Sequence, residues 1–459
     1  MTSSHVHGIL HTSALFQAID SSGIFQGGLR MAGGEQSDQP RCLVQDTQRL
    51  ADVEHKHARI RELLRVAAAD AVLLQDPANL AWLTAGADLT RNTPDGCQTS
   101  IFVTEEARVF ATNAVDSPQL FERDVFGLGF QLKEREWFQP HRLLVEDLCR
   151  GRRVLCDTPL AGTRLAARPL QSLRLSLTTL DVQRLRQLCR VLVHAVEVTA
   201  GQLRPGITEA AVAGEIAHRL LRRTVQPVRI QVCADGRNQR YRRWSFGEDS
   251  IQNFASVSCT ARRWGLHAAV SRTMCFGDAP RELAAAHQKA ALVHATGLHF
   301  TRPGETVAAV WTRVRRIYEK FGMPSEWLLA DQADLLGYRP SEHQFVPASD
   351  LLLQPGMLVF WHPSMGAAMP GDTLLLGSQR GEFLTESSVW PEVRVHVRDQ
   401  EWRCCGILSL QRRDAADESA RWETESDQTE LEFPRNQPEP ARLESIWELD
   451  PAIVRMLRP

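Results

Sequence analysis

The pattern of hydrophobic and polar residues becomes regular near Val53, where secondary structure is predicted to begin. The run HARIRELLRVAAA, from His57, places apolar residues at helical spacing, and the apolar run AVLLQD after it is typical of a short buried strand. In TSIFVTEEARVFAT, two β-rich halves flank a turn at Glu105 and Glu106, which predicts a strand pair. Strands and helices alternate to about Leu177, so we predict an α/β domain over residues 51–177.

A second region opens with a long predicted helix from near Asp181 and contains a repeated unit. The tetrapeptide LVHA occurs at residues 192–195 and again at residues 292–295. Each copy is followed by RPG, in which proline and glycine favour a turn, and then by a threonine suited to cap a second helix, Thr208 or Thr306. Two copies of one helix–turn–helix unit indicate a duplicated half-domain, and we assign residues 178–400 to it.

The two ends of the chain have a different composition. Residues 1–50 are rich in Gly, Ser and Gln and are predicted to form a flexible extension, in which residues 9–16 could dock as a short element. Residues 401–459 are predicted to be a disordered tail, because twelve acidic residues against three arginines between Asp414 and Asp450 cannot bury enough apolar surface. The last apolar run of this tail, IWELDPAIVRML, could be an interaction peptide.

Composition narrows the functional classes. A formal charge of −2 over 459 residues argues against bulk attraction to nucleic acid. The ten cysteines include no CxxC pair, so neither a zinc knuckle nor a disulfide framework is indicated. The N-terminus lacks the pattern of a secretory signal, and no apolar run approaches the ~20 residues that span a bilayer. We therefore expect a cytoplasmic protein without nucleic-acid or membrane partners.

Several segments of the chain resemble segments of a known family. They are the two RPGxT turns, CADGRN at 233–238, ASVSCTARRWGLHAAVSRTMCFG at 255–277, QPGMLVFWHP at 354–363 and GDTLLL at 371–376. Together they resemble the pita-bread family, which includes creatinase, prolidase, aminopeptidase P and methionine aminopeptidase. The resemblance spans roughly residues 55–395. It implies an α/β (α+β) fold, with a creatinase-like N-terminal α/β domain followed by a duplicated pita-bread domain. Since larger relatives often pair through the N-terminal domain, a homodimer is also expected.

The resemblance further implies where a catalytic centre would lie. The hydrolases of the family hold two divalent metals with two Asp, one His and two Glu, and a metal-bridged water is the nucleophile. Alignment through the flanking residues places Ser258, Ala269, Tyr338, His362 and Gly371 at these five positions. Only His362 is a competent ligand, and one imidazole cannot hold a dinuclear cluster. We therefore expect neither a metal nor another cofactor. The histidine that contacts substrate in the family is similarly replaced, near Arg243.

Loss of the carboxylates would leave a cleft lined by cationic and imidazole groups. The candidates are Arg240, Arg242, Arg243, Arg262, Arg272, Arg339, His267, His343 and His362. A guanidinium is a planar fork suited to carboxylate or phosphate, so the expected partner is a small molecule or peptide end with an anionic group. The ligand contacts that we expect are made by Arg243, Arg272, His267, Tyr338, Arg339 and His343. In the alternative interpretation, these arginines point outward as ordinary solubilising charge.

Three functions remain open from the sequence. The first is a pseudo-peptidase that binds its ligand without metal. The second is a metal-independent C–N hydrolase of creatinase type, in which His362 is the general base with Glu342 or Asp372 as its partner, or His267 takes that role. The third is an Xaa-Pro-type metallo-aminopeptidase with ligands at other positions. The residues that could supply them are Asp278, Asp334, Glu342, His343 and Asp372.

Overall fold

The computed structural model describes residues 45–89, 99–379 and 381–411 of the chain. The segment 9–16 and the acidic stretch from 414 to the C-terminus, including its last apolar run, lie outside these residues. No helix within the described ranges is long and apolar enough to cross a membrane.

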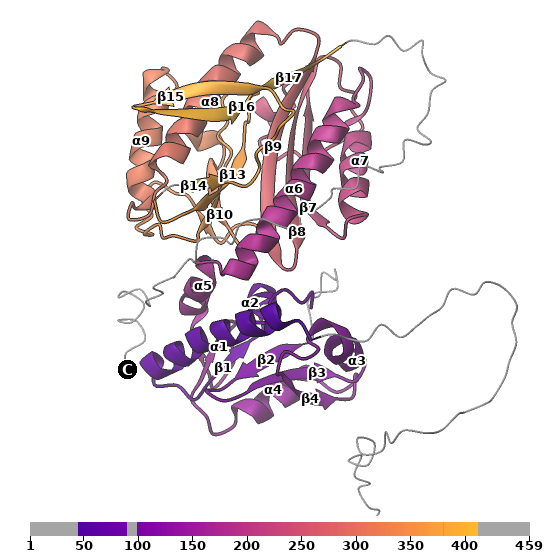
Figure 1. Cartoon of the computed structure of the whole chain (residues 1–459), viewed down its shortest axis with the longest axis vertical. Coiled ribbons are helices and arrows are strands. Elements are labelled where there is room, and N and C mark those ends of the chain that lie inside the picture. The colour runs from indigo at the N-terminus through magenta and orange to yellow at the C-terminus, as the bar shows by residue number, and fades with distance from the viewer. Residues whose placement is uncertain (1–44, 90–98, 380, 412–459) are drawn as a thin grey trace, which may run out of the picture. The chain divides into compact units, whose positions relative to one another are not determined.

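The first part of the described chain is built on a mixed six-stranded sheet, with strand order β4-β3-β2-β1-β5-β6 (Figure 1). The predicted strand pair is confirmed, since β2 and β3 are antiparallel neighbours. Helix α1 begins earlier than the predicted helical run, because the side chain of Asp46 caps it by accepting a hydrogen bond from the amide of Arg49. The elements are α1 (Thr47–Ala67), β1 (Ala71–Leu74), α2 (Pro77–Leu83), β2 (Ser100–Val103), β3 (Arg108–Asn113), α3 (Ser117–Gln119), η1 (Leu120–Asp124), β4 (Gln131–Arg135), α4 (His141–Cys149), β5 (Val154–Cys156), β6 (Arg164–Leu165) and α5 (Ala167–Leu175).

The predicted duplication is confirmed by matching helix pairs, α6–α7 and α8–α9. The side chains of Thr208 and Thr306 cap the second helix of each pair, each accepting from the amide three residues later, at 3.1 and 3.2 Å. The amides of Gly206 and Gly304 each donate to a carbonyl of the loop that returns beside the turn. The two units therefore share their local hydrogen bonds as well as their sequence. Their helices are α6 (Thr179–Gly201), α7 (Glu209–Leu221), α8 (Arg281–Phe300) and α9 (Val307–Lys320).

Each helix pair belongs to its own sheet. Helices α6 and α7 lie along a four-stranded sheet with strand order β17-β9-β8-β7 (Figure 1). The second unit carries a five-stranded sheet with strand order β11-β10-β12-β13-β14. The strands are β7 (Gln226–Ala234), β8 (Phe254–Arg263), β9 (Leu266–Phe276), β10 (Ala333–Leu336), β11 (His343–Gln344), β12 (Leu358–Trp361), β13 (Asp372–Leu376), β14 (Gly381–Phe383) and β17 (Ile407–Leu410), with two short 3-10 turns at η2 (Arg237–Gln239) and η3 (Glu326–Leu329).

The two sheets meet where β9 approaches β13. Ser271 and Gly371 form an isolated antiparallel bridge, and the hydroxyl of Thr373 donates to the carbonyl of Ala269 at 2.6 Å. Every residue of β9 is buried. The junction is therefore a packed, hydrogen-bonded part of the core.

The prediction of a disordered tail from residue 401 is wrong for residues 401–405 and 407–410, which form strands. Strand β16 (Gln400–Cys405) pairs with β15 (Glu392–Val397) in an antiparallel hairpin. Strand β17 lies at the edge of the four-stranded sheet, parallel to β9. The acidic composition that led to the prediction starts only after these strands. The side chains of Trp402 and Cys404 on β16 are apolar and buried, and their packing stabilises this strand.

Helix α8 fixes the end of β12 by a close approach at Gly297. A Cβ atom at this position would lie 2.6 Å from the indole ring of Trp361, the last residue of β12. The same indole donates to the hydroxyl of Thr301 at 2.9 Å. Because Trp361 is held in this way, the chain leaves β12 in a defined direction, toward His362.

We predict opposite effects for two helical glycines replaced by alanine. Gly297→Ala should lower the free energy of unfolding by about 1–3 kcal/mol, because the new methyl group overpacks the buried Trp361 ring. Gly214→Ala in α7, where a Cβ would meet no atom within 4 Å, should raise it by up to about 1 kcal/mol through helix propensity. Urea unfolding measures both, and equal signs would contradict the close packing.

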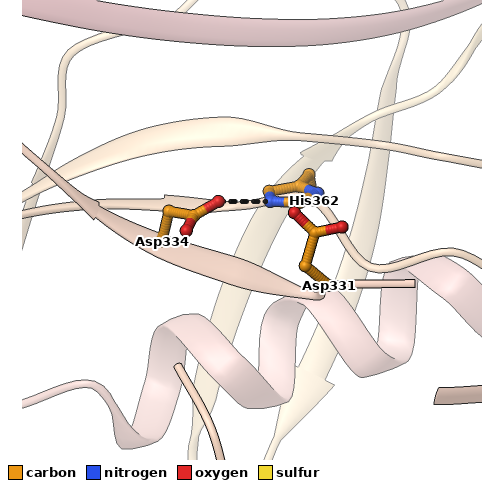
Figure 2. A group of neighbouring side chains, drawn as sticks. All are labelled: Asp331, Asp334 and His362. Atoms are coloured by element: carbon orange, nitrogen blue, oxygen red, sulfur yellow. Dashed lines mark hydrogen bonds and ion pairs between the residues drawn. The ribbon is translucent and has the colours of Figure 1, made fainter. Parts of the chain in front are cut away.

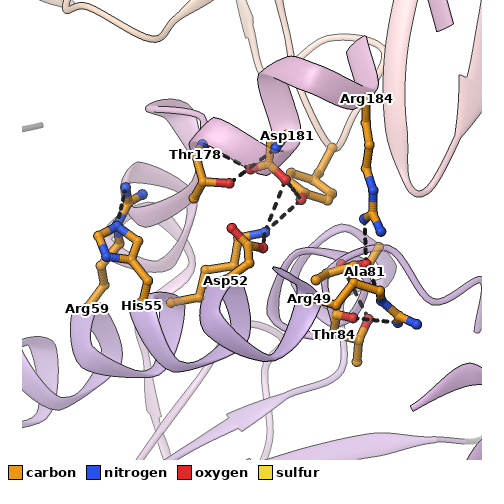
Figure 3. A network of polar contacts seen from close by, with 12 residues as sticks. Arg49, Asp52, His55, Arg59, Ala81, Thr84, Thr178, Asp181 and Arg184 are labelled. Carbon is orange, nitrogen blue, oxygen red and sulfur yellow. Dashed lines mark hydrogen bonds and ion pairs between the residues drawn. The ribbon is translucent and has the colours of Figure 1, made fainter. Parts of the chain in front are cut away.

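A buried charge cluster connects α1 to α6 and to the loop after β10. Lys56 is fully buried, with its Nζ 2.5 Å from Asp52 and 3.1 Å from Asp181. The hydroxyl of Tyr338 donates to Asp181 at 2.6 Å, and Lys56 donates to the same hydroxyl at 3.0 Å. Figure 3 shows Asp52 and Asp181 converging, with Thr178 capping α6 beside them. Burial, together with the negative charges of the aspartates, raises the pKa of Tyr338 well above its ordinary value, so the phenol stays protonated.

We predict that Tyr338→Phe lowers the free energy of unfolding by about 1–3 kcal/mol, because it removes a hydrogen bond from a buried charged group. Tyr241→Phe is the matched control, because that tyrosine is 46% exposed, and it should change stability by less than about 0.5 kcal/mol. If both variants unfold at the same urea concentration as the parent, the cluster does not contribute as described.

Candidate functional site

The five positions implied as metal ligands lie on or just outside the strands of the two sheets. Ser258 is on β8 and Ala269 on β9, while His362 directly follows β12 and Gly371 directly precedes β13. Gly371 bridges Ser271, which is the cross-strand neighbour of Ser258. Tyr338 follows β10, and its hydroxyl bonds Asp181 in the buried charge cluster.

The side chains at these positions do not fit a dinuclear metal centre. Ser258 offers a neutral hydroxyl, Ala269 a methyl group and Gly371 no side chain. The Tyr338 phenol is protonated and already bonded to Asp181 and Lys56. Two divalent ions held side by side require several anionic oxygen ligands, and none of these groups is one.

The space at Gly371 is also occupied. A Cβ atom there would lie 3.0 Å from both the Phe360 ring and Cβ of Ser271. A side chain at residue 371 would therefore require the Phe360 ring and Ser271 to give by a few tenths of an ångström.

His362 is the remaining imidazole, and its ring is held from several directions. It stacks on Phe360, with ring centroids 4.6 Å apart and planes inclined by 23°. Its backbone amide donates to the carbonyl of Gln332 at 2.9 Å, and its Nε2 lies 3.4 Å from Oδ2 of Asp334. The hydroxyl of Ser341 donates to the other carboxylate oxygen of Asp334 at 2.6 Å.

The carboxylate beside His362 is thus Asp334, and neither of the two expected partners takes this place. Glu342 is buried in an ion pair with Arg174, and Asp372 is buried against Arg272. Burial alone would raise the pKa of Asp334. The hydrogen bonds from His362 and Ser341 and the nearby positive charge outweigh it, so that this pKa is lowered and the group is ionised.

A second carboxylate, Asp331, completes a small cluster with Asp334 and His362. One ligand atom from each of the three side chains lies within 4.8 Å of the others. Figure 2 shows the two carboxylates approaching the imidazole ring from different sides. Asp331 is only half-buried and lies 3.7 Å from the guanidinium of Arg243.

A small hollow of about 10 Å³ lies beside His362, enough for about one water molecule or ion. Two of the side chains that line it carry a buried polar atom without a hydrogen-bond partner, Oδ1 of Asn238 and Oγ of Ser364. Arg242 also lines the hollow, and it donates to Glu326 at 2.9 Å and to the carbonyl of Gly366 at 3.1 Å. The lining residues are Arg229, Asn238, Arg242, Ala330, Asp331, His362, Ser364 and Met369.

The candidate cations do not converge as a group on this hollow. Arg272 is fully buried, between Glu197 and Asp372, while Arg262 pairs with Gln226 and Arg339 with Asp76. Arg240 is exposed, and the side chain of Arg243 is 73% exposed. Only Arg242 and, through Asp331, Arg243 are brought to the His362 region.

The other two candidate imidazoles lie elsewhere in the structure. Burial lowers the pKa of His267 to about 3, and its Nδ1 is 3.2 Å from the carbonyl of Gly337. His343 is on β11, where its Nε2 is 2.7 Å from the hydroxyl of Ser349. Both rings therefore interact with groups of the fold.

A larger cavity of about 820 Å³ is lined by residues of β15, β16 and the end of α8, including Trp390 and Trp402. Within the described residues, none of its lining side chains carries a buried polar atom without a partner. The cavity therefore has room for a small molecule, but its described lining provides no unpaired buried polar group that would indicate which molecule binds there.

The sequence interpretation named Asp334 and Arg242 as candidates, but it missed other groups around His362, among them Arg229, Asn238 and Asp331. Arg229 lies on β7, Asn238 lies in the 3-10 turn η2 that follows it, and Asp331 precedes β10, the otherwise apolar strand that contains Asp334. The one available signal was the charged residue within ADLL, because an aspartate inside an apolar strand requires a partner.

Comparison with known proteins identifies the family of the second part of the chain. Residues 183–399 match metallopeptidase family M24. No curated protein matches the chain in sequence.

Solved structures extend the similarity in fold. The Xaa-Pro dipeptidase from Bacillus anthracis aligns with a TM-score of 0.63 and 17% identity, over 78% of this chain and 100% of the other. The prolidase from Pyrococcus horikoshii OT3 aligns with a TM-score of 0.63 and 14% identity, over 73% and 99%. The dipeptidase PepE from Mycobacterium ulcerans aligns with a TM-score of 0.64 and 16% identity, over 79% and 99%. The chain therefore carries a domain of metallopeptidase family M24 and has the pita-bread fold of that family.

Proposed function

We propose that this protein is a divergent M24 homologue that has lost the dinuclear metal centre and binds a small anionic or peptidic ligand without it. The observation that carries the proposal is the chemistry of the five implied ligand positions. They supply one imidazole and no carboxylate, and a Cβ atom at Gly371 would be in tight contact with the Phe360 ring. Peptide hydrolysis by a metal-bridged water would have no ligand set to support it.

The proposed ligand contacts are two guanidinium groups in and beside the small hollow, Arg229 and Arg243, of which only Arg243 was expected from the sequence. Arg229 lines the hollow and is exposed, and it donates from Nε and Nη2 to the neutral amide oxygen of Gln231. Arg243 is exposed nearby, with Asp331 3.7 Å away. A ligand carboxylate can pair with such a fork in two parallel hydrogen bonds. The hollow itself is too small for a dipeptide, so most of the ligand would lie outside it.

A second candidate is a metal-independent C–N hydrolase, and the contact between His362 and Asp334 favours it. A carboxylate beside an imidazole orients the ring and stabilises its protonated form, which suits a general base. In this alternative His362 would take a proton from water or substrate near the hollow. Two of the similar structures, an Xaa-Pro dipeptidase and a prolidase, suggest Xaa-Pro dipeptides as the substrates to test first.

The proposal is tested by assaying the full chain on Xaa-Pro dipeptides with and without added Mn²⁺, and with chelator. We predict no hydrolysis in any condition and fewer than two bound metal ions per chain by elemental analysis. The same dipeptides should raise the melting temperature, since a ligand at 100 times its Kd stabilises by about 2.7 kcal/mol. Arg229→Gln should reduce this rise, while Arg222→Gln, at another exposed arginine, should not.

Two results would overturn the proposal in different ways. Hydrolysis that chelator abolishes, with two ions per chain, would restore a metallopeptidase whose ligands lie at other positions. Hydrolysis that survives chelator and is lost in His362→Ala would establish the metal-independent hydrolase instead.

A further inference from the structure

We propose that Asp331, Asp334 and His362 bind a single divalent transition-metal ion, at a site that shares only His362 with the five implied positions. The inference goes beyond the proposed function and does not rest on it. The ligand contacts proposed above are guanidinium groups, and the loss of a two-metal centre does not exclude one ion at other side chains.

The imidazole of His362 and the carboxylate of Asp334 are separated by a distance that fits two ligands of one metal ion. Nε2 of His362 and Oδ2 of Asp334 are 3.4 Å apart. This is longer than the usual 2.7–3.2 Å of an N–H···O hydrogen bond, which is about 2.9–3.0 Å at its most common. It is close to the separation of about 3.4 Å between two ligands that each lie about 2.1 Å from a tetrahedral ion. In the absence of an ion this contact is a long hydrogen bond, and its spacing also fits two ligands of one ion.

Asp331 supplies the third ligand, and it is more exposed than Asp334 and His362. Asp331 places a carboxylate oxygen within 4.8 Å of both other ligand atoms, and it is half-buried where they are buried. Three protein ligands of this kind leave a fourth coordination position open. One nitrogen and two carboxylate oxygens are a ligand set typical of Zn²⁺, Co²⁺ or Mn²⁺, whereas Mg²⁺ and Ca²⁺ prefer oxygen alone.

The hollow beside the ligands provides a separate observation in favour of a bound ion. It has room for about one water molecule or ion, and both Asp331 and His362 line it. Asn238 and Ser364 also line the hollow; they are 3% and 2% exposed, and each carries a buried oxygen atom without a hydrogen-bond partner. Such atoms are costly to bury unless they have a partner, and a water on the open coordination position would supply one.

The surroundings of the ligands are those of a supported site. Ser341 donates to the second oxygen of Asp334 at 2.6 Å, which leaves the first oxygen directed at His362. Phe360 holds the imidazole plane by stacking. Partners that orient metal ligands in this way commonly change affinity when they are removed. Arg243, 3.7 Å from Asp331, and the two arginines that line the hollow, Arg229 and Arg242, have the opposite influence, because their positive charges oppose a cation.

The test is a titration of the chelator-treated full chain with Co²⁺, followed by visible absorption and calorimetry. We expect one ion per chain and a ligand-field absorption band that Zn²⁺ displaces. His362→Ala should abolish the band. Asp331→Asn should weaken binding at least about tenfold, and Ser341→Ala by about 10–100-fold.

Matched controls separate this site from adventitious binding. Asp350→Asn and His396→Ala change exposed residues of the same types and should leave the affinity unchanged. Circular dichroism of metal-free Asp331→Asn should match that of the parent, because residue 331 is half-buried and its loss should not unfold the chain.

Each possible stoichiometry has a defined meaning. No bound ion, or equal affinity in Asp331→Asn and Asp350→Asn, would overturn the inference and leave the proposed function standing. Two ions per chain would overturn the proposed function as well.

Discussion

The contact between β9 and β13 determines what the centre of this protein can do. The duplicated unit produces two sheets, and they meet at the bridge between Ser271 and Gly371. The hydroxyl of Thr373 and the backbone of Ala269 reinforce the contact on the same strands. Since every residue of β9 is buried, a side chain on this strand must be apolar or fully bonded. Arg272 meets that requirement by pairing with Glu197 and Asp372.

The same junction is where the family resemblance implies metal ligands, and here it contains packing groups. A serine, an alanine and a glycine allow the strands and the Phe360 ring to come close together, and the implied histidine position is a tyrosine tied to Lys56 and Asp181. Burying carboxylates in a low-dielectric interior without bound ions would cost free energy. The absence of carboxylates at these positions is therefore consistent with the close packing of the strands. Polar side chains are instead found beside the junction, around His362.

Much of the fold follows from local patterns in the sequence. Thr208 and Thr306 signal the duplicated turns because a threonine cap acts over three residues, and the β2–β3 pair follows from its flanking apolar runs. Strands β16 and β17 were not predicted, because they form by pairing with β15 and β9. The acidic stretch that follows them also dominated the composition of residues 401–459, on which the prediction was based. The partners of the candidate site residues were also missed. Asp334 lies 28 positions from His362 in the sequence, and Glu342 pairs with Arg174 across 168 positions. Spacing along a chain does not determine contacts of that kind.

The most direct measurement is a crystal structure of the full chain soaked in Mn²⁺, with an anomalous difference map recorded at the manganese edge. We expect a single peak between Asp331, Asp334 and His362, and no peak between β8 and β9 at Ser258 and Ala269. A pair of peaks beside Ser258, Ala269 and Gly371 would contradict the conclusion that packing has replaced the dinuclear centre.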